Sequence, residues 1–298
     1  MPIVELHRTD RTNESSKLLQ KFAFDDTSQF GEDGILEEVF KRIGTTNKWC
    51  VEFGAWDGKL YSNTWRLIAK FDWSAVLIEG MEDRARDLAQ LHKGSSKVHV
   101  QNCFVSWTGE NRLDNLLAKT PIPRQFDLLS IDIDGNDYHV WNSVERYQPR
   151  VVIIEINPTA SNDLLFVQDA DAGLNQGCSL RARIELAKSK DYELAATTRV
   201  NAIFVTKSEF PKLGIEDNSI DAMHFADFTT ELFQGYDGSM FVAGHDVLIW
   251  QGKKIDHEAL QIIPKGSRKY PPPKLTFFGK LRRSFIRRYS LLSSVFVK

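Results

Sequence analysis

The chain has 298 residues, of which 42% are hydrophobic and 26% are charged, and its formal net charge is −2. This composition is typical of a folded globular protein and excludes disorder as the default state of the chain. The first residues lack the apolar stretch of a signal peptide, and no uncharged apolar run reaches the roughly 18 residues of a membrane-spanning helix, so we expect a cytoplasmic protein. The three cysteines have no CxxC spacing, which argues against a disulfide framework or a thiolate zinc site.

Apolar segments with strand character alternate with segments of helical periodicity from residue 31 to residue 206. The predicted strands are 49–53, 75–79, 97–101, 126–132 and 151–156, and the predicted helices are 31–43, 62–70, 84–92, 112–119, 139–146 and 179–189. This alternation predicts an α/β fold with an open, mostly parallel sheet. Segments 192–197 and 201–206 lie only three residues apart, a separation that suits an antiparallel hairpin at the sheet edge.

Changes in composition divide the chain into four parts. They are an N-terminal extension (1–30), an α/β core (31–206), an appended substrate-side or lid segment (207–270) and a basic tail (271–298). Residues 265–298 contain ten Lys or Arg and no Asp or Glu, so all 40 acidic residues lie in the preceding part of the chain. Three consecutive prolines at 271–273 interrupt regular structure between the body and the tail.

The tail has the pattern of a basic amphipathic helix. Between residues 274 and 298 its large apolar residues recur at steps of three and four, and Arg283, Arg287 and Arg288 lie off that row. Such a helix can rest on an anionic membrane surface, which predicts peripheral contact at the inner face of a membrane. Packing of the apolar row on the acidic body or on a second subunit is an equal alternative. We do not expect nucleic acid as a partner, because the body is acidic and the tail contains no recognisable binding module.

The turn after the first predicted strand is the first candidate ligand site, because ligands of open α/β sheets bind beyond the carboxyl ends of the strands. It reads CVEFGAWDGK and contains Glu52, Gly54, Asp57 and Gly58. A dinucleotide site needs GxGxxG, whereas this turn has the spacing GxxxG and an aspartate that would repel phosphate. The turn therefore favours S-adenosylmethionine, which has no phosphate and carries a positive sulfonium. Two glycines in a tight turn can also serve the backbone alone.

Two more polar residues complete the predicted cofactor site. Glu79 ends the second predicted strand and can accept hydrogen bonds from two ribose hydroxyls; the alternative is a solvated acid at a strand end. Asn102 follows the third predicted strand and could contact the adenine edge.

The string FDLLSIDIDGNDYHVW runs from an apolar strand into Asp132, Asp134, Asn136 and Asp137. Burying several like charges is costly unless a cation, a partner or a proton compensates them, so this cluster suggests function. Strand alternation puts Asp132 and Asp134 on the same side, where they can hold Mg²⁺ or supply a general base. An Asp-Gly-Asn turn with helix-capping acids is the alternative, and it explains Asp137 best.

Other residues join this edge of the predicted sheet. The fifth predicted strand ends in EINP, which brings Glu155 and Asn157 to the same rim. Three histidines, His139, His224 and His245, are rival bases, although a single histidine is more often structural. The predicted catalytic residues are Asp134, Asp132 and His139, and Asp132 and Asp134 are also the ligands of an optional Mg²⁺.

Several strings resemble those of one family when their order and spacing are taken together. They are SQFGEDGIL, VEFGAWDG, AVLIEG, RLDNLL, FDLLSIDIDGNDYHVW, VVIIEINP and GCSLRARIELAKSKDYEL followed by VNAIFV. Over residues 28–206 the chain resembles FkbM-type S-adenosylmethionine-dependent methyltransferases, especially those of bacterial glycan and polysaccharide biosynthesis. The resemblance implies a class I methyltransferase (Rossmann-like) sheet, O-methylation, and cofactor contacts at Glu52, Gly54, Gly58 and Glu79.

A more distant likeness concerns the acids. Asp132, Asp134 and Tyr138 are similar to the metal-binding pattern of macrocin-type sugar O-methyltransferases. We therefore expect an S-adenosylmethionine-dependent O-methyltransferase that acts on a hydroxyl of a sugar, a lipid-linked glycan or another glycan-biosynthesis intermediate. The alternatives are a methyltransferase of a small non-sugar metabolite, with a nitrogen or oxygen acceptor, and a catalytically inactive methyltransferase-fold scaffold in a glycan assembly complex.

Overall fold

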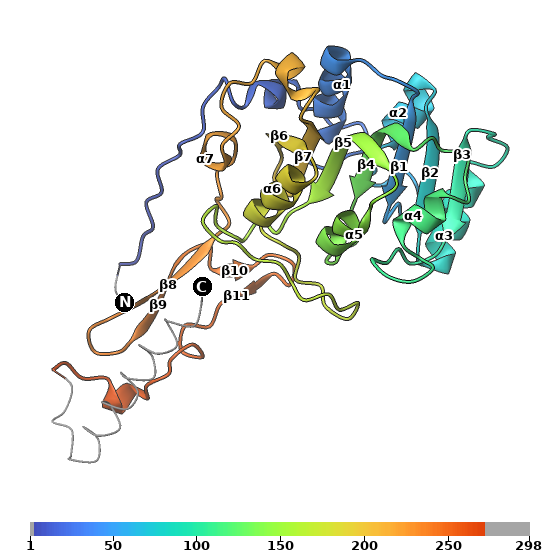
Figure 1. Ribbon diagram of the computed structural model, residues 1–298. Helices are drawn as coiled ribbons and strands as arrows, with labels where there is room; N and C mark the ends of the chain where they lie inside the picture. Colours follow the sequence, from blue (N-terminus) through green and yellow to red (C-terminus); the bar gives the residue numbers. More distant parts are fainter. Residues whose placement is uncertain (1–2, 272–298) are drawn as a thin grey trace. The chain divides into compact units, whose positions relative to one another are not determined.

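The computed structural model describes residues 3–271 (Figure 1). The chain divides into two compact units, which we call the sheet unit, Thr9–Thr229, and the hairpin unit, Met1–Arg8 with Thr230–Lys298. The predicted tail helix at 274–298 lies outside the described residues. Within 3–271, no helix is both long enough and apolar enough to cross a bilayer.

The sheet unit is built on one seven-stranded sheet (Figure 1). Its strands are β1 (Trp49–Phe53), β2 (Ser74–Glu79), β3 (Val98–Asn102), β4 (Gln125–Ile131), β5 (Gln148–Glu155), β6 (Tyr192–Thr197) and β7 (Asn201–Thr206). Their order is β3-β2-β1-β4-β5-β7-β6, and β7 runs antiparallel to both of its neighbours. The predicted α/β fold, an open and mostly parallel sheet with an antiparallel edge, is confirmed.

Helices connect the strands and cover the sheet. They are α1 (Glu32–Ile43), α2 (Trp65–Phe71), α3 (Glu82–Leu91), α4 (Leu113–Leu117), α5 (Asp137–Ser143), α6 (Leu180–Ser189) and α7 (Ile220–Met223), with 3₁₀ turns at Leu18–Phe22, Phe210–Leu213 and Lys265–Ser267. Strands β1, β2, β4 and β5 are almost completely buried, as expected of strands that are covered on both faces. Helices α5 and α6 contact each other on the same side of the sheet (Figure 1).

The hairpin unit contains four short strands. Strand β8 (Thr230–Gln234) pairs antiparallel with β9 (Met240–Gly244), and β10 (Val247–Leu248) pairs antiparallel with β11 (Lys253–Lys254). All five residues of β8 are exposed. Among the described residues of this unit, only Val242 and Ala243 are buried hydrophobic residues.

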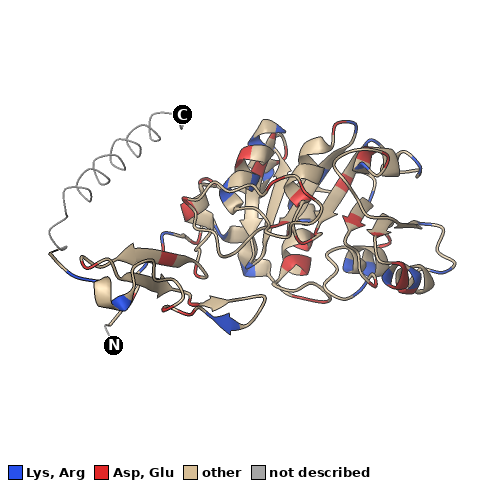
Figure 2. Cartoon of the chain, turned by 90° about the horizontal axis from the view of Figure 1, so that it is seen from below, with Lys and Arg blue, Asp and Glu red and all other residues tan. Residues whose placement is uncertain are grey.

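Two predicted boundaries differ from the structure. Residues 207–229 belong to the sheet unit and not to a separate lid, because Leu213, Ile215 and Met223 are buried there. The Arg42 guanidinium also donates to the carbonyl oxygen of Leu213 over 2.6 Å. Residues 9–30, predicted to be part of an extension, are in the same unit, and Leu19 is fully buried. Acidic side chains occur throughout the sheet unit, interspersed with Lys and Arg (Figure 2).

Candidate active site

The site lies at the point where the chain turns to opposite sides of the sheet. The chain proceeds from β1 outward to β2 and β3, and from β4 in the other direction to β5. The register aligns Ile78, Phe53, Ile131 and Ile154 across four neighbouring strands. The next residues along the chain are therefore brought to one edge: Glu79, Gly54, Asp132 and Glu155. This edge is the topological switch point at which ligands of open α/β sheets bind.

The turn after β1 is pressed against β2 and β4. The N–H groups of Gly54 and Ala55 donate to the carbonyl oxygen of Ile78 over 3.1 and 3.2 Å. A Cβ atom at Gly54 would overlap the carbonyl oxygen of Asp132, and the φ angle of +75° also disfavours an L side chain. Glycine at this position is therefore required by the approach of the two chain segments.

Glu52 is buried and is enclosed by the chain's own donors. Its carboxylate accepts hydrogen bonds from Ser62 Oγ at 2.6 Å, Asn63 N at 2.8 Å and Thr64 Oγ1 at 2.8 Å, and Ser130 Oγ lies 3.3 Å away. Burial raises the pKa of Glu52, while these hydrogen bonds act in the opposite direction. The geometry shows Glu52 ordering the segment that leads into α2. A direct contact with the cofactor stays a prediction.

Asp57 and Gly58 shape the same turn. Asp57 Oδ1 accepts hydrogen bonds from the N–H groups of Lys59 at 2.9 Å and Leu60 at 2.8 Å. Gly58 lies against the side chain of Leu88 in α3, so a Cβ atom there would have to displace it. Both predicted cofactor residues thus have structural roles, and no contact with a ligand is needed to explain them.

Glu79 is held by two backbone hydrogen bonds, and its contact with a ribose stays a prediction. Its two carboxylate oxygens each accept one backbone hydrogen bond, Oε2 from Trp56 N and Oε1 from Met81 N, both at 2.8 Å. Each oxygen has two lone pairs, so one acceptor position per oxygen remains for a ligand hydroxyl. The two backbone donors fix the carboxylate between the turns that follow β1 and β2.

Three exposed apolar side chains lie near Glu79. None of them was predicted from the sequence to be part of the site. Trp56, Met81 and Phe104 are 44%, 53% and 68% exposed, and the Phe104 ring lies against Gly80, directly after Glu79. The predicted adenine contact, Asn102, instead uses its amide to donate to the carbonyl oxygens of Glu79 and Gly80. Phe104, an aromatic residue just past the third strand, was the feature of the sequence that could have indicated a surface for stacking of the adenine base.

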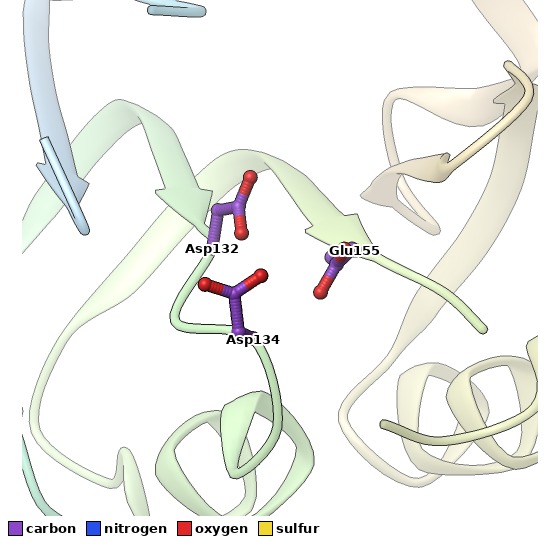
Figure 3. Close-up of side chains that lie close together, drawn as sticks. All are labelled: Asp132, Asp134 and Glu155. Atoms are coloured by element: carbon purple, nitrogen blue, oxygen red, sulfur yellow. The ribbon is translucent and has the colours of Figure 1, made fainter. Parts of the chain in front are cut away.

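Asp132, Asp134 and Glu155 form an acidic cluster at the ends of β4 and β5 (Figure 3). One oxygen of each carboxylate lies within 4.8 Å of the others. The sequence predicted that Asp132 and Asp134 would meet, but strand alternation is not the reason: β4 ends at Ile131. Asp134 instead adopts a left-handed conformation with φ +57°, which turns the chain back. The predicted arrival of Glu155 at the same rim is confirmed.

Burial and like charges raise the pKa values of the acidic cluster. The pKa of Glu155 is raised to about 9, first by burial and then by Asp132, Asp137 and Asp134. The pKa of Asp132 is raised well above its ordinary value by burial and then by Asp137 and Asp134, and that of Asp134 is raised by burial and by Asp137. The cluster therefore favours a proton or another positive charge.

Asp137 and Arg183 form the support beneath the cluster. Asp137 is fully buried and accepts hydrogen bonds from Ile133 N at 2.8 Å and Gly135 N at 3.0 Å. Both donors lie in the turn before α5, so Asp137 closes that turn and does not cap the helix, which has no side-chain cap. Arg183 in α6, only 1% exposed, lies 3.8 Å from Asp137, and its Nε donates to the carbonyl oxygen of Glu155 over 3.1 Å. Arg183 lowers the pKa of Glu155. No role for Arg183 was predicted from the sequence. Its place on the apolar face of a predicted helix was the one feature of the sequence that could have indicated it.

The three histidines that were candidate bases lie in different parts of the structure. His139 Nε2 lies 2.8 Å from the carbonyl oxygen of Gln168, so this nitrogen carries the proton and donates it to the hydrogen bond. Its ring packs near Trp107 and Tyr138, with centroids 5.7 and 5.5 Å away. His139 therefore anchors the segment between β5 and α6, and its catalytic role stays a prediction. His224 lies in the sheet unit, where burial lowers its pKa, and His245 lies in the hairpin unit.

Residues 109–177 match the family model described as the Methyltransferase FkbM domain. This segment contains the whole acidic cluster, Asp137 and His139. The match and the sheet order support the methyltransferase predicted from the sequence. No curated protein matches the chain.

The solved structures similar to this chain include several methyltransferases. The N-terminal domain of EvdMO1, described in the presence of SAH and D-fucose, is 13% identical, with 67% of this chain and 99% of that chain covered and a TM-score of 0.40. A SAM-dependent methyltransferase from Aquifex aeolicus is 12% identical over 63% of this chain and 95% of that chain, with a TM-score of 0.37. An S-adenosylmethionine-dependent methyltransferase from Clostridium acetobutylicum is 10% identical over 59% and 90%, with a TM-score of 0.38.

Proposed function

We propose that this chain is an S-adenosylmethionine-dependent O-methyltransferase that acts on a hydroxyl of a sugar or of a glycan-biosynthesis intermediate. The observation that carries the proposal is the acidic cluster Asp132, Asp134 and Glu155 at the switch point. It lies inside the segment that matches the methyltransferase family model. A hydroxyl acceptor needs a base, whereas a methyltransferase of an already basic nitrogen does not.

The residues on the β2 side of the edge fit the cofactor. The Glu79 carboxylate retains acceptor positions for two ribose hydroxyls, and Trp56, Met81 and Phe104 offer exposed apolar surface for the adenine ring. S-adenosylmethionine, when bound, supplies an activated methyl group on a positive sulfonium. The negative potential of the neighbouring acidic cluster favours a positively charged ligand.

The acidic cluster would remove the proton of the acceptor hydroxyl. Asp134 is exposed, whereas Glu155 is only partly exposed, and we assign Asp134 as the carboxylate that the acceptor reaches. An alcohol is a weak acid, and a carboxylate with a raised pKa is a stronger base toward it than an ordinary carboxylate. The chain's remaining contribution is alignment of the acceptor oxygen with the methyl group.

The same three carboxylates also offer the hard oxygen ligands that Mg²⁺ prefers. A divalent ion held there would lower the pKa of a hydroxyl bound to it and would replace the protons that the cluster otherwise holds. We include this ion in the proposal as an optional addition. If a chelator leaves turnover unchanged, the ion is not part of the mechanism, and the proposed carboxylate base still stands.

Calorimetry with S-adenosylhomocysteine tests the cofactor assignment. We expect micromolar binding to the wild type and a loss of about tenfold or more in Glu79→Ala, which removes the acceptor of two hydrogen bonds. Glu82→Ala is the matched control, since this exposed glutamate in the first turn of α3 pairs with Arg86, at 3.2 Å, and with no other residue that the structure describes. A wild type that does not bind S-adenosylhomocysteine would contradict the proposal and would favour the inactive scaffold.

Methyl transfer to a panel of sugars tests the base. Asp134→Asn should bind S-adenosylhomocysteine like the wild type but lose about 100-fold or more in turnover, the usual contribution of a general base. Full turnover in Asp134→Asn would show that the proton leaves by another route. Transfer to amines but not to hydroxyls would favour the small-metabolite alternative.

A further inference from the structure

A second cavity, which we call the edge cavity, lies in the sheet unit apart from the residues assigned so far. Its volume is about 360 Å³, and it is lined by side chains from residues 10–35 and 197–227 together with Pro158. The lining includes two basic residues, Lys17 and Arg199, and two aromatic residues, Phe30 and Phe225. None of these residues contributes to the function proposed above.

The chain path places the edge cavity at the same edge of the sheet as the acidic cluster. Pro158 follows Glu155 by three residues, so their Cα atoms are at most about 11 Å apart. The turn between β6 and β7, which carries Arg199, is joined to the end of β5: Ile156 N donates to Val200 O over 2.7 Å, and Asn201 pairs with Glu155. The edge cavity and the acidic cluster therefore both adjoin the end of β5.

The two basic residues of the edge cavity have no carboxylate partner. Among residues 3–271, neither Lys17 nor Arg199 forms an ion pair within 4.0 Å. The Arg199 guanidinium instead lies over the rings of Phe30 and Phe228, 5.6 and 4.6 Å from their centroids. Contact with two rings orients the guanidinium, whose N–H groups donate to no residue that the structure describes and can bind an anionic ligand.

Within residues 3–271, the acids of the edge cavity form no ion pair within 4.0 Å with these cations, although the charge of Lys17 contributes, after hydrogen bonds from Thr12, to lowering the pKa of Asp10. Asp10 Oδ1 accepts the N–H of Thr12 at 2.8 Å. Asp227 is exposed and acts on His224, whose pKa it raises while burial and Lys17 lower it. An exposed carboxylate and aromatic faces suit the hydroxyls and the C–H face of a sugar, and the two unpaired cations suit an acidic substituent on that sugar.

We propose that the edge cavity is the acceptor-anchoring subsite of the active site, where Lys17 and Arg199 bind the anionic substituent of an acidic sugar. The substituent is a carboxylate, as in a uronic acid, or a phosphate. With the substituent held there, a hydroxyl of the same sugar or of its neighbour reaches Asp134. This inference rests on the proposed function and specifies its acceptor as an acidic sugar.

Binding of three probes to the full chain loaded with S-adenosylhomocysteine tests the inference. The probes are glucose, glucuronate and glucose 1-phosphate. Saturation-transfer NMR detects the binding of each probe, and calorimetry measures its affinity. We expect at least one anionic probe to bind about tenfold or more tightly than glucose. Preference for glucuronate identifies a carboxylate substituent, and preference for glucose 1-phosphate identifies a phosphorylated acceptor.

Variants locate the binding. Lys17→Ala and Arg199→Ala should each weaken the anionic probe by about tenfold and leave the affinity for S-adenosylhomocysteine and the unfolding temperature unchanged. Arg199→Lys keeps the charge but loses the planar guanidinium. Its affinity for the anionic probe should lie between that of Arg199→Ala and that of the wild type. The matched control is Lys207→Ala, because this exposed lysine follows β7 at the opposite edge of the sheet.

Three results overturn the inference. They are anionic probes that bind no better than glucose, no detectable binding of any probe, and anion binding that both Lys17→Ala and Arg199→Ala retain. A wild type that binds S-adenosylhomocysteine but fails these probes refutes only the edge cavity. A wild type that does not bind S-adenosylhomocysteine refutes the proposed function, whatever the sugars do.

Discussion

At the scale of single residues, the acids of the site divide into those that serve the fold and those that remain available to a ligand. Glu52, Asp57 and Asp137 accept hydrogen bonds from nearby N–H or hydroxyl groups that would otherwise have no partner. Glu79 and Asp134 keep open acceptor positions. The sequence could identify all of them as acids near strand ends, but the division depends on which donors surround each carboxylate.

The acidic cluster predicts an unusual dependence of stability on pH. The pKa of Glu155 rises from its ordinary value of 4.5 to about 9 in the folded chain, chiefly through burial. Folding therefore favours the protonated form, so the contribution of Glu155 is complete below pH 4.5 and is lost as the pH rises through 9. The ligand-free wild type should unfold at a lower temperature at pH 9 than at pH 6, and Glu155→Gln, which cannot ionise, should show a smaller decrease.

Thermal unfolding at the two pH values measures this difference. Glu185→Gln, on the exposed surface of α6, is the control. Its unfolding temperature should decrease between pH 6 and pH 9 by as much as that of the wild type. An equal decrease in the wild type and Glu155→Gln would mean that Glu155 ionises without cost in the folded chain.

At the scale of elements, the site depends on how closely the turn after β1 approaches the end of β4. Gly54 makes this approach possible, because any Cβ atom there would overlap the backbone of Asp132. The contact is between main-chain atoms, so rotation of a side chain cannot relieve it. The position of Asp132, and with it the acidic cluster, thus depends on a glycine in the turn that follows another strand.

Gly54→Ala should therefore destabilise the chain more than an alanine at a glycine with the same backbone conformation but open surroundings. Gly94 is that control, since its φ is +86° and no atom lies within 4 Å of the position that a Cβ atom would take. Gly94→Ala should cost about 1 kcal/mol for the left-handed conformation. Gly54→Ala should add at least about 1 kcal/mol for the steric overlap. Urea unfolding measures both, and equal losses would show that the β1 turn can move away from β4.

At the scale of the whole molecule, the buried core belongs almost entirely to the sheet unit. Outside residues 9–229, Val242 and Ala243 are the only buried hydrophobic residues among those described. The edge that carries Glu79, the acidic cluster and the edge cavity also lies within 9–229. We therefore expect the sheet to fold, and the proposed site to assemble, without the hairpin unit.

A chain reduced to residues 9–229 should fold cooperatively and bind S-adenosylhomocysteine as the full chain does. A chain reduced to residues 9–206 is the comparison, because it also loses buried Leu213, Ile215 and Met223 and the bond from Thr197 Oγ1 to Met223 O. Removing three buried side chains should lower its unfolding temperature markedly. Calorimetry of both chains checks this, and equal unfolding temperatures would restore the boundary predicted at residue 206.

The sequence by itself determined the parts of this protein that depend on local pattern. Periodicity identified the strands and helices of the sheet, and the three-residue gap between β6 and β7 identified the antiparallel edge. Because parallel strands end at a common edge, the positions of Glu79, Asp132 and Glu155 at the ends of their strands also followed from the sequence.

Only the tertiary structure decided which of these residues meet and which donors surround each one. The donors to Glu52 come from a later turn and from β4, and Arg183 reaches Asp137 from a helix 46 residues further along the chain. The edge cavity joins residues 10–35 to residues 197–227. Such contacts depend on packing between segments far apart in sequence, and local propensity contains no information about distant partners. The pKa of a carboxylate depends on those partners and on burial, so the chemistry of the site became visible only in the folded chain.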